Sequence, residues 1–158
     1  MTKFLLAVHV LAAIVAIGPV TVAAGMFPPA ARRALASPDD PRAAETVLLL
    51  HRVCRVYAVV GVAVPVFGFG TASSMGVLGD AWLIASIVLT ALAALVLGAL
   101  VLPRQTALVE GVGAAVARPA SRDGRATVRL AMVTGVFNLL WAAVTVLMIV
   151  RPGSTTGA

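Results

Sequence analysis

Four long apolar stretches, none of which contains Asp, Glu, Lys or Arg, constrain this chain more than any other feature. They run from Phe4 to Phe27, from Val56 to Gly79, from Ala81 to Leu102 and from Leu130 to Val150. A transmembrane helix needs roughly 20 mostly apolar residues. The stretches are continuous rather than alternating, and a small sheet would leave open edges in lipid. The sequence therefore predicts an all-α polytopic membrane protein, a bundle of four transmembrane helices.

The composition agrees with a lipid environment. Apolar residues make up 61% of the chain and charged residues 11%, against about 45–50% and about 25% in soluble domains. The net charge of +6 also occurs in nucleic-acid-binding proteins, but here the arginines lie between apolar stretches. We therefore expect the lipid bilayer, and no nucleic acid, as the partner of this chain.

We expect one membrane domain, residues 1–150, followed by a disordered tail, 151–158. Its helices are predicted at about 4–27, 53–70, 81–102 and 130–150. The second is expected to end near Gly70, because small polar residues follow. Asp40 before Pro41 is typical of a helix start, so this helix is also expected to extend through water back to about Pro41.

The distribution of positive charge predicts the topology. Ten of the twelve Lys and Arg residues lie in or beside two connections, residues 28–51 and 103–129, and only Lys3 and Arg151 lie at the other side. The positive-inside rule places both connections in the cytoplasm and both termini outside the cell (inner) membrane. A cleavable signal peptide is the competing interpretation of the first stretch, but its apolar run exceeds the usual 7–15 residues.

Two histidines are candidates for chemistry. His9 lies within the first stretch, roughly 8 Å from its outer end at 1.5 Å per residue, and could ligate haem or a metal or relay a proton. The alternative is a packing role, with the ring hydrogen-bonded to a neighbouring helix. His51 is expected to face lipid headgroups at the inner interface. The two lie near opposite faces of the membrane, so they cannot share one haem.

Other candidate contacts are polar or small. Asn138, in the middle of the fourth stretch, is expected to seek a partner across helices or to contact a substrate. Arg52, Arg55 and Arg129 are expected to reach anionic lipid headgroups, and Cys54 to be a packing residue. The pairs Ala94–Gly98 and Ala131–Gly135 predict close helix contacts. The chain has no P-loop, dinucleotide fingerprint or serine elbow, so enzymatic activity is not the favoured interpretation.

Short motifs point to a family. The run from Phe4 to Gly18 carries His9 nine residues before a glycine, Arg52-x-x-Arg55-x-Tyr57 opens the second helix, and Trp82-Leu83 opens the third. This pattern resembles a superfamily of small bacterial membrane proteins. It includes the copper-resistance protein D family, the HemJ-type protoporphyrinogen oxidases and an uncharacterised family of predicted integral membrane proteins, to which the likeness is closest.

The resemblance implies haem or metal chemistry at His9, with two departures. HemJ-type enzymes pair this histidine with a membrane lysine, and the third stretch of this chain has none. No Met or His cluster accompanies His9, as copper handling would require.

Three functions therefore stay open. The first, which we favour, is a small integral membrane protein acting as an accessory or self-associating subunit, as a homo-oligomer. The second is a haem- or porphyrin-handling protein that uses His9. The third is a small-solute or metal transporter that uses His9 and Asn138.

Overall fold

The computed structural model describes residues 2–114 and 123–153, and every regular element in these ranges is helical. Four helical columns are long and apolar enough to cross a membrane, which confirms the expected fold class. They are Thr2–Ala36, Pro41–Met75, Ala81–Ala114 and Gly124–Val150. Of the predicted tail, residues 154–158 lie outside the described part of the chain.

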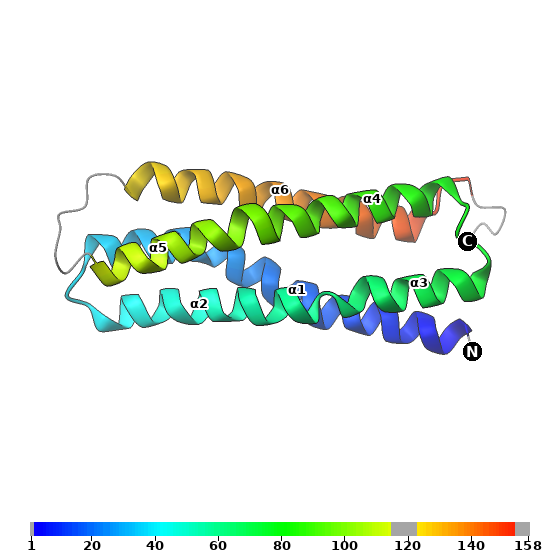
Figure 1. The fold of residues 1–158 in the computed structure, drawn as a ribbon, viewed down its shortest axis with the longest axis horizontal. Helices are drawn as coiled ribbons and strands as arrows, with labels where there is room; N and C mark the ends of the chain where they lie inside the picture. The colour runs from blue at the N-terminus through cyan, green and yellow to red at the C-terminus, as the bar shows by residue number, and fades with distance from the viewer. Residues whose placement is uncertain (1, 115–122, 154–158) are drawn as a thin grey trace.

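Seven elements build the four columns (Figure 1). They are α1 (Thr2–Ala36), α2 (Pro41–Val60), α3 (Ala63–Met75), α4 (Ala81–Leu95), the π-helix η1 (Val96–Val101), α5 (Leu102–Ala114) and α6 (Asp123–Val150). The second column consists of α2 and α3, and the third of α4, η1 and α5.

All four helices are longer than predicted. The connection expected at 28–51 is helical except for residues 37–40, and that expected at 103–129 is helical up to Ala114 and again from Asp123. Pro28 and Pro29 do not end α1, because packing compensates for their missing N–H groups: Phe27, Pro28 and Ala31 are all buried. At about 1.5 Å per residue, 35 residues span about 52 Å, well beyond a hydrocarbon core of about 30 Å.

The sequence predicts the start of the second column correctly, but not its end. The start at Pro41 is as expected, and the Asp40 carboxylate caps the helix by accepting a hydrogen bond from the Arg42 N–H at 3.0 Å. The end lies at Met75, not near Gly70. Thr71 and Ser74 donate their hydroxyls to Phe67 and Thr71 carbonyls, so these polar residues are satisfied inside the helix. Gly76, at φ 71°, terminates it.

Two columns are interrupted within the membrane. Between α2 and α3 the chain tightens, and the N–H groups of Val62 and Val64 bond to Val59 and Gly61 carbonyls three residues back. Pro65 accounts for this break, because it lacks an N–H for the Gly61 carbonyl and its ring crowds that group. The third column widens into η1; π-turns of this kind occur frequently at functional sites.

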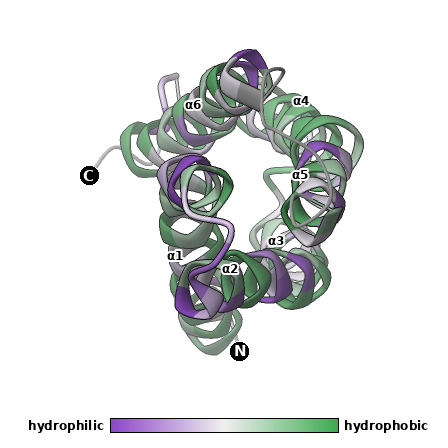
Figure 2. Cartoon of the chain, turned by 90° about the vertical axis from the view of Figure 1, so that its left-hand side faces the viewer, coloured by the Kyte–Doolittle hydropathy of each residue, from purple (hydrophilic) through white to green (hydrophobic). Residues whose placement is uncertain are grey.

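The columns surround the bundle axis, and α1 contacts α2, α3, α5 and α6. Seen along the axis (Figure 2), α6 lies beside α1 and α4, while α2 lies between α1 and α5; the same pairs are in contact. The buried face of α1 is largely alanine, which allows close helix approach. These alanines are Ala16, Ala23, Ala24, Ala31 and Ala34.

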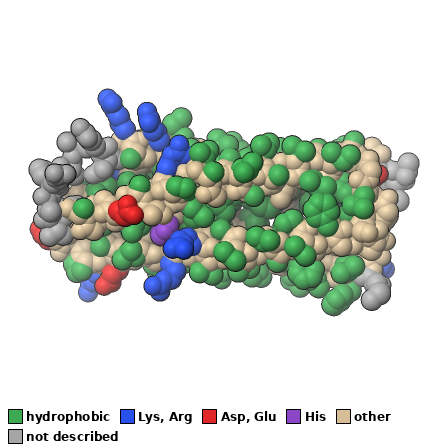
Figure 3. Space-filling model, viewed as in Figure 1, with side chains coloured by type: hydrophobic (Ala, Val, Ile, Leu, Met, Phe, Trp, Pro, Cys, Tyr) green, Lys and Arg blue, Asp and Glu red, His purple; other side chains and the backbone are tan. Residues whose placement is uncertain are grey.

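The bundle has one charged end and one end where α3 and α4 diverge. Both termini and the turn at residues 76–80 lie at one end, and the turn at 37–40 lies at the other (Figure 1). Most Lys, Arg, Asp and Glu side chains gather at this second end, and hydrophobic side chains cover the rest (Figure 3). There α2 packs on α5, whereas toward the termini α3 packs mainly on α1, and α4 on α6.

Candidate functional site

His9 is buried and faces α3. Its Nδ1 lies 3.0 Å from the carbonyl oxygen of Val64, in the first turn after the break. Its ring packs over Gly68, where a Cβ atom would stand 3.0 Å from His9 Cε1 and 3.3 Å from Nδ1. His9 therefore joins α1 to α3, and Gly68 provides the space for its ring.

This contact determines which nitrogen of His9 is free. A carbonyl only accepts hydrogen bonds, so Nδ1 carries the proton and Nε2 keeps the lone pair. That tautomer suits a haem iron or a metal ion. The packing does not suit a flat macrocycle, since one ring edge is held against Gly68.

A second polar cluster lies where α1, α2 and α5 meet. Gln105 is fully buried; its Oε1 lies 3.2 Å from His51 Nδ1 and its Nε2 lies 3.5 Å from Cys54 Sγ. Phe27 of α1 meets the His51 ring edge-on, with centroids 6.4 Å apart. The expectation that His51 faces lipid headgroups is wrong. His51 points to Gln105, because the third column continues as a helix beyond the predicted end and places α5 beside it.

Gln105 uses both atoms of its side-chain amide in this cluster. The Gln105 amide N–H₂ donates to Cys54, so its Oε1 accepts from His51 Nδ1. His51 Nε2 lies 3.5 Å from Thr106 Oγ1, but the hydroxyl of Thr106 donates its one proton to the Leu102 carbonyl at 3.1 Å. The expected packing role of Cys54 agrees with its complete burial. This cluster joins α2 to α5 at the arginine-rich end of the bundle.

Asn138 does not find the helix partner that was expected for it. Its Oδ1 is buried and has no hydrogen-bond partner among the described residues. The same holds for Thr134 Oγ1 and Trp141 Nε1, on the same side of α6. The three residues stand at i, i+4 and i+7, so they form one polar line along the helix.

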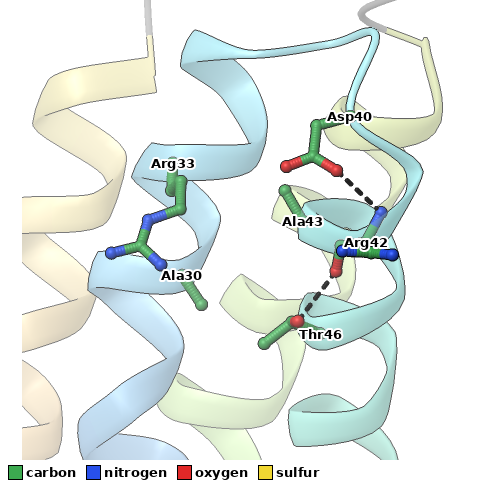
Figure 4. Close-up of a pocket in the computed structure, with 6 residues that line it drawn as sticks. All are labelled: Ala30, Arg33, Asp40, Arg42, Ala43 and Thr46. Atoms are coloured by element: carbon green, nitrogen blue, oxygen red, sulfur yellow. Dashed lines mark hydrogen bonds between the residues drawn. The ribbon is translucent and has the colours of Figure 1, made fainter.

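The three candidate arginines, Arg52, Arg55 and Arg129, are all exposed. A pocket of about 140 Å³ lies farther out, between α1 and α2 (Figure 4). Arg33 and Arg42 line it together with Asp40 and Thr46. The Asp40 carboxylate and the Thr46 hydroxyl already bond to the Arg42 backbone, which leaves the two guanidinium groups as its free donors.

The two small-residue pairs do not mediate contacts within this chain, contrary to expectation. Ala94, Gly98 and Ala131 are exposed, and Gly135 is only partly covered. A Cβ added at Gly98 or Gly135 would meet nothing within 4 Å. The close contacts inside the bundle are made instead by the alanine face of α1.

Several residues of these sites were not singled out from the sequence. Gln105 and Thr106 follow Pro103 and Arg104, a context that predicts a loop, and Thr134 and Trp141 are common residues of membrane helices. Their significance depends on which helix each one faces. In the described ranges, no group of three or more His, Cys, Asp or Glu residues could hold a metal ion.

Comparison with known proteins gives one match. A family model described as a predicted integral membrane protein (DUF2269) matches residues 3–152, nearly the whole chain. No curated protein and no solved structure matches it.

Proposed function

We propose that this chain, which belongs to the DUF2269 family of predicted integral membrane proteins, works as a self-associating membrane subunit whose partner is a second copy of itself. The observation that carries this proposal is the outward-facing small-residue surface of α6. This surface consists of Ala131, Gly135 and Ala142, with Asn138 at its edge.

Small residues in membrane helices let another helix approach closely. At Gly135 no side chain of this chain uses the space, because nothing lies within 4 Å of a Cβ built there. Ala131 and Ala142 are likewise exposed. The helix that these residues would accommodate must therefore come from another molecule.

The spacing supports pairing with an identical helix. Positions 131, 135, 138 and 142 are separated by four, three and four residues, the heptad spacing of two helices packed along a common seam. Asn138 lies at the edge of that seam, but its Oδ1 is buried within the chain, so the small residues carry the proposed contact. Gly98 and Ala94 on the third column offer a second open surface of the same kind.

We propose that the charged end of the bundle lies on the cytoplasmic side of the cell membrane and that both termini lie outside. The positive-inside rule supports this orientation. Arg52, Arg55 and Arg129 are exposed, so their guanidinium groups can reach anionic headgroups without rearrangement.

Haem or porphyrin handling at His9 is a second candidate function. The His9 Nδ1–Val64 contact favours it, because Nε2 is left with the lone pair that an iron atom needs. The ring's position against Gly68 counts against it. We therefore prefer self-association as the function.

Two neighbouring alanines give a matched test. Ala142 lies on the proposed surface and Ala143 is exposed about 100° away around the same helix. Oligomeric state would be measured by size-exclusion chromatography with light scattering in mild detergent, and by energy transfer between labelled copies in liposomes. We expect an oligomer for the wild type, a monomer for Ala142→Ile, and an unchanged oligomer for Ala143→Ile. A wild-type monomer in both media, or equal behaviour of the two variants, contradicts the proposal.

A further inference from the structure

The polar line on α6 contains buried side-chain atoms that have no hydrogen-bond partner among the described residues. Thr134 is only 3% exposed, and its Oγ1 is buried without a hydrogen bond among the described residues. Seven other helical hydroxyls of this bundle bond to a carbonyl of their own helix. Those of Thr46, Thr71, Ser86, Thr106 and Thr145 bond to the carbonyl four residues back, and those of Ser74 and Thr127 bond to the carbonyl three residues back. The hydroxyl of Thr134 is therefore available for another partner.

The neighbouring atoms require a partner that both donates and accepts. Trp141 Nε1 can only donate, and Asn138 Oδ1 can only accept. Both atoms are buried and unpaired among the described residues. Leaving a buried polar group unpaired costs about 1–3 kcal/mol, so three such groups on one face of one helix favour a bound partner.

The other columns are also irregular within their apolar stretches. Pro19 interrupts the N–H pattern of α1, the α2–α3 break lies at Gly61 and Val62, and η1 widens the third column. At 1.5 Å per residue, each of these irregular segments lies about 6–17 Å, measured along its own column, from the residue of that column at the arginine-rich end (Phe27, His51 or Gln105). Asn138 lies about 14 Å along α6 from Arg129. Irregular backbone at membrane depth is tolerated where it is buried in protein or lines a hydrated cavity.

We propose that Thr134, Asn138 and Trp141 form a binding site for water inside the bundle, near the middle of the membrane. The chemical class follows from the lining: a small, uncharged molecule that both donates and accepts hydrogen bonds. No Asp, Glu, Lys or Arg lies between Arg129 and Arg151, so the site offers nothing to balance a charge. Water can bond to all three groups, and buried waters typically have two to four such partners.

This inference goes beyond self-association, because it concerns the interior of one chain. Trp141 can report on it. The chain has two tryptophans, so Trp82→Phe leaves Trp141 as the sole fluorophore. We expect the fluorescence emission maximum of Trp141 to shift to shorter wavelength in Thr134→Val and in Asn138→Leu. We also expect both variants to lose the increase in Trp141 fluorescence intensity on transfer to D₂O. Thr134→Ser keeps the hydroxyl and should keep both signals.

Thr127→Val is the matched control, because Thr127 is fully buried on α6 but its hydroxyl bonds to the Gly124 carbonyl. It should leave the emission of Trp141 unchanged. Thermal stability in detergent gives a second measurement: Thr134→Val should not stabilise the protein if water satisfies the hydroxyl. A D₂O-insensitive Trp141 in the parent, emission that is the same in Thr134→Val and Thr127→Val, or stabilisation by Thr134→Val would overturn the proposal.

Discussion

His9 Nδ1 lies 3.0 Å from the carbonyl oxygen of Val64, and this contact joins the first helix to the second column just beyond its break. The same ring lies against Gly68, where an added Cβ would stand 3.0 Å from His9 Cε1 and would require the ring to shift. α3 packs mainly on α1. The position of α3 in the bundle is therefore sensitive to the two residues that hold it there, His9 and Gly68.

Gly68→Ala is expected to destabilise the protein. The added methyl would stand 3.0 Å from His9 Cε1, and overpacking of this kind costs about 1–3 kcal/mol. Gly70→Ala is the matched control on the same helix, since a Cβ there meets nothing within 4 Å; alanine should be neutral or stabilise by up to about 1 kcal/mol. Thermal unfolding in detergent measures both. Equal effects of the two substitutions would show that the ring is not packed on Gly68.

Gln105→Leu is expected to loosen the arginine-rich end of the bundle. Leucine keeps the volume but leaves His51 Nδ1 without its acceptor, at a cost of about 1–3 kcal/mol. Thr106→Val should cost less, because its contact with His51 is long, at 3.5 Å, and its side chain is exposed. Amide hydrogen exchange of residues 50–56 would be measured in both variants and compared. Greater exchange in Thr106→Val than in Gln105→Leu would contradict the assigned roles.

The orientation in the membrane can be tested with single cysteines in a Cys54→Ala background. Ser37 and Leu78 are exposed in turns at opposite ends of the bundle. With an impermeant thiol reagent on intact cells, we expect Leu78→Cys to react and Ser37→Cys to react only after permeabilisation. The reverse pattern would place the arginine-rich end outside.

The sequence was sufficient for the parts of the fold that depend on composition and local signals. Continuous apolar stretches predicted the four membrane helices, and Asp40-Pro41 predicted the start of α2, because capping depends on adjacent residues. The helix ends near Phe27 and Gly70 were placed too early. Pro28 and Ser74 favour a helix end in isolation, but tertiary packing and back-bonded hydroxyls keep them helical.

The candidate sites were harder to predict, because they depend on which helix faces which. His9 was identified because a histidine within an apolar stretch is unusual, whereas its contact with Gly68 requires the register between α1 and α3. Gln105 is ordinary in sequence and becomes important only through its position between His51 and Cys54. The π-helix η1 has no sequence signal comparable to the proline that accounts for the α2–α3 break.

The role of His9 separates the two candidate functions. If the ring is a structural link, protein purified after haem supplementation should show no Soret band. His9→Ala should then lower the free energy of unfolding by about 1–3 kcal/mol, because it removes a buried hydrogen bond and its packing. His9→Ala should also suppress the effect of Gly68→Ala, since the methyl then has no ring to meet. A Soret band in the wild type that disappears in His9→Ala while the bundle stays folded would instead establish His9 as a haem ligand. It would also mean that the ring leaves Gly68 when haem binds.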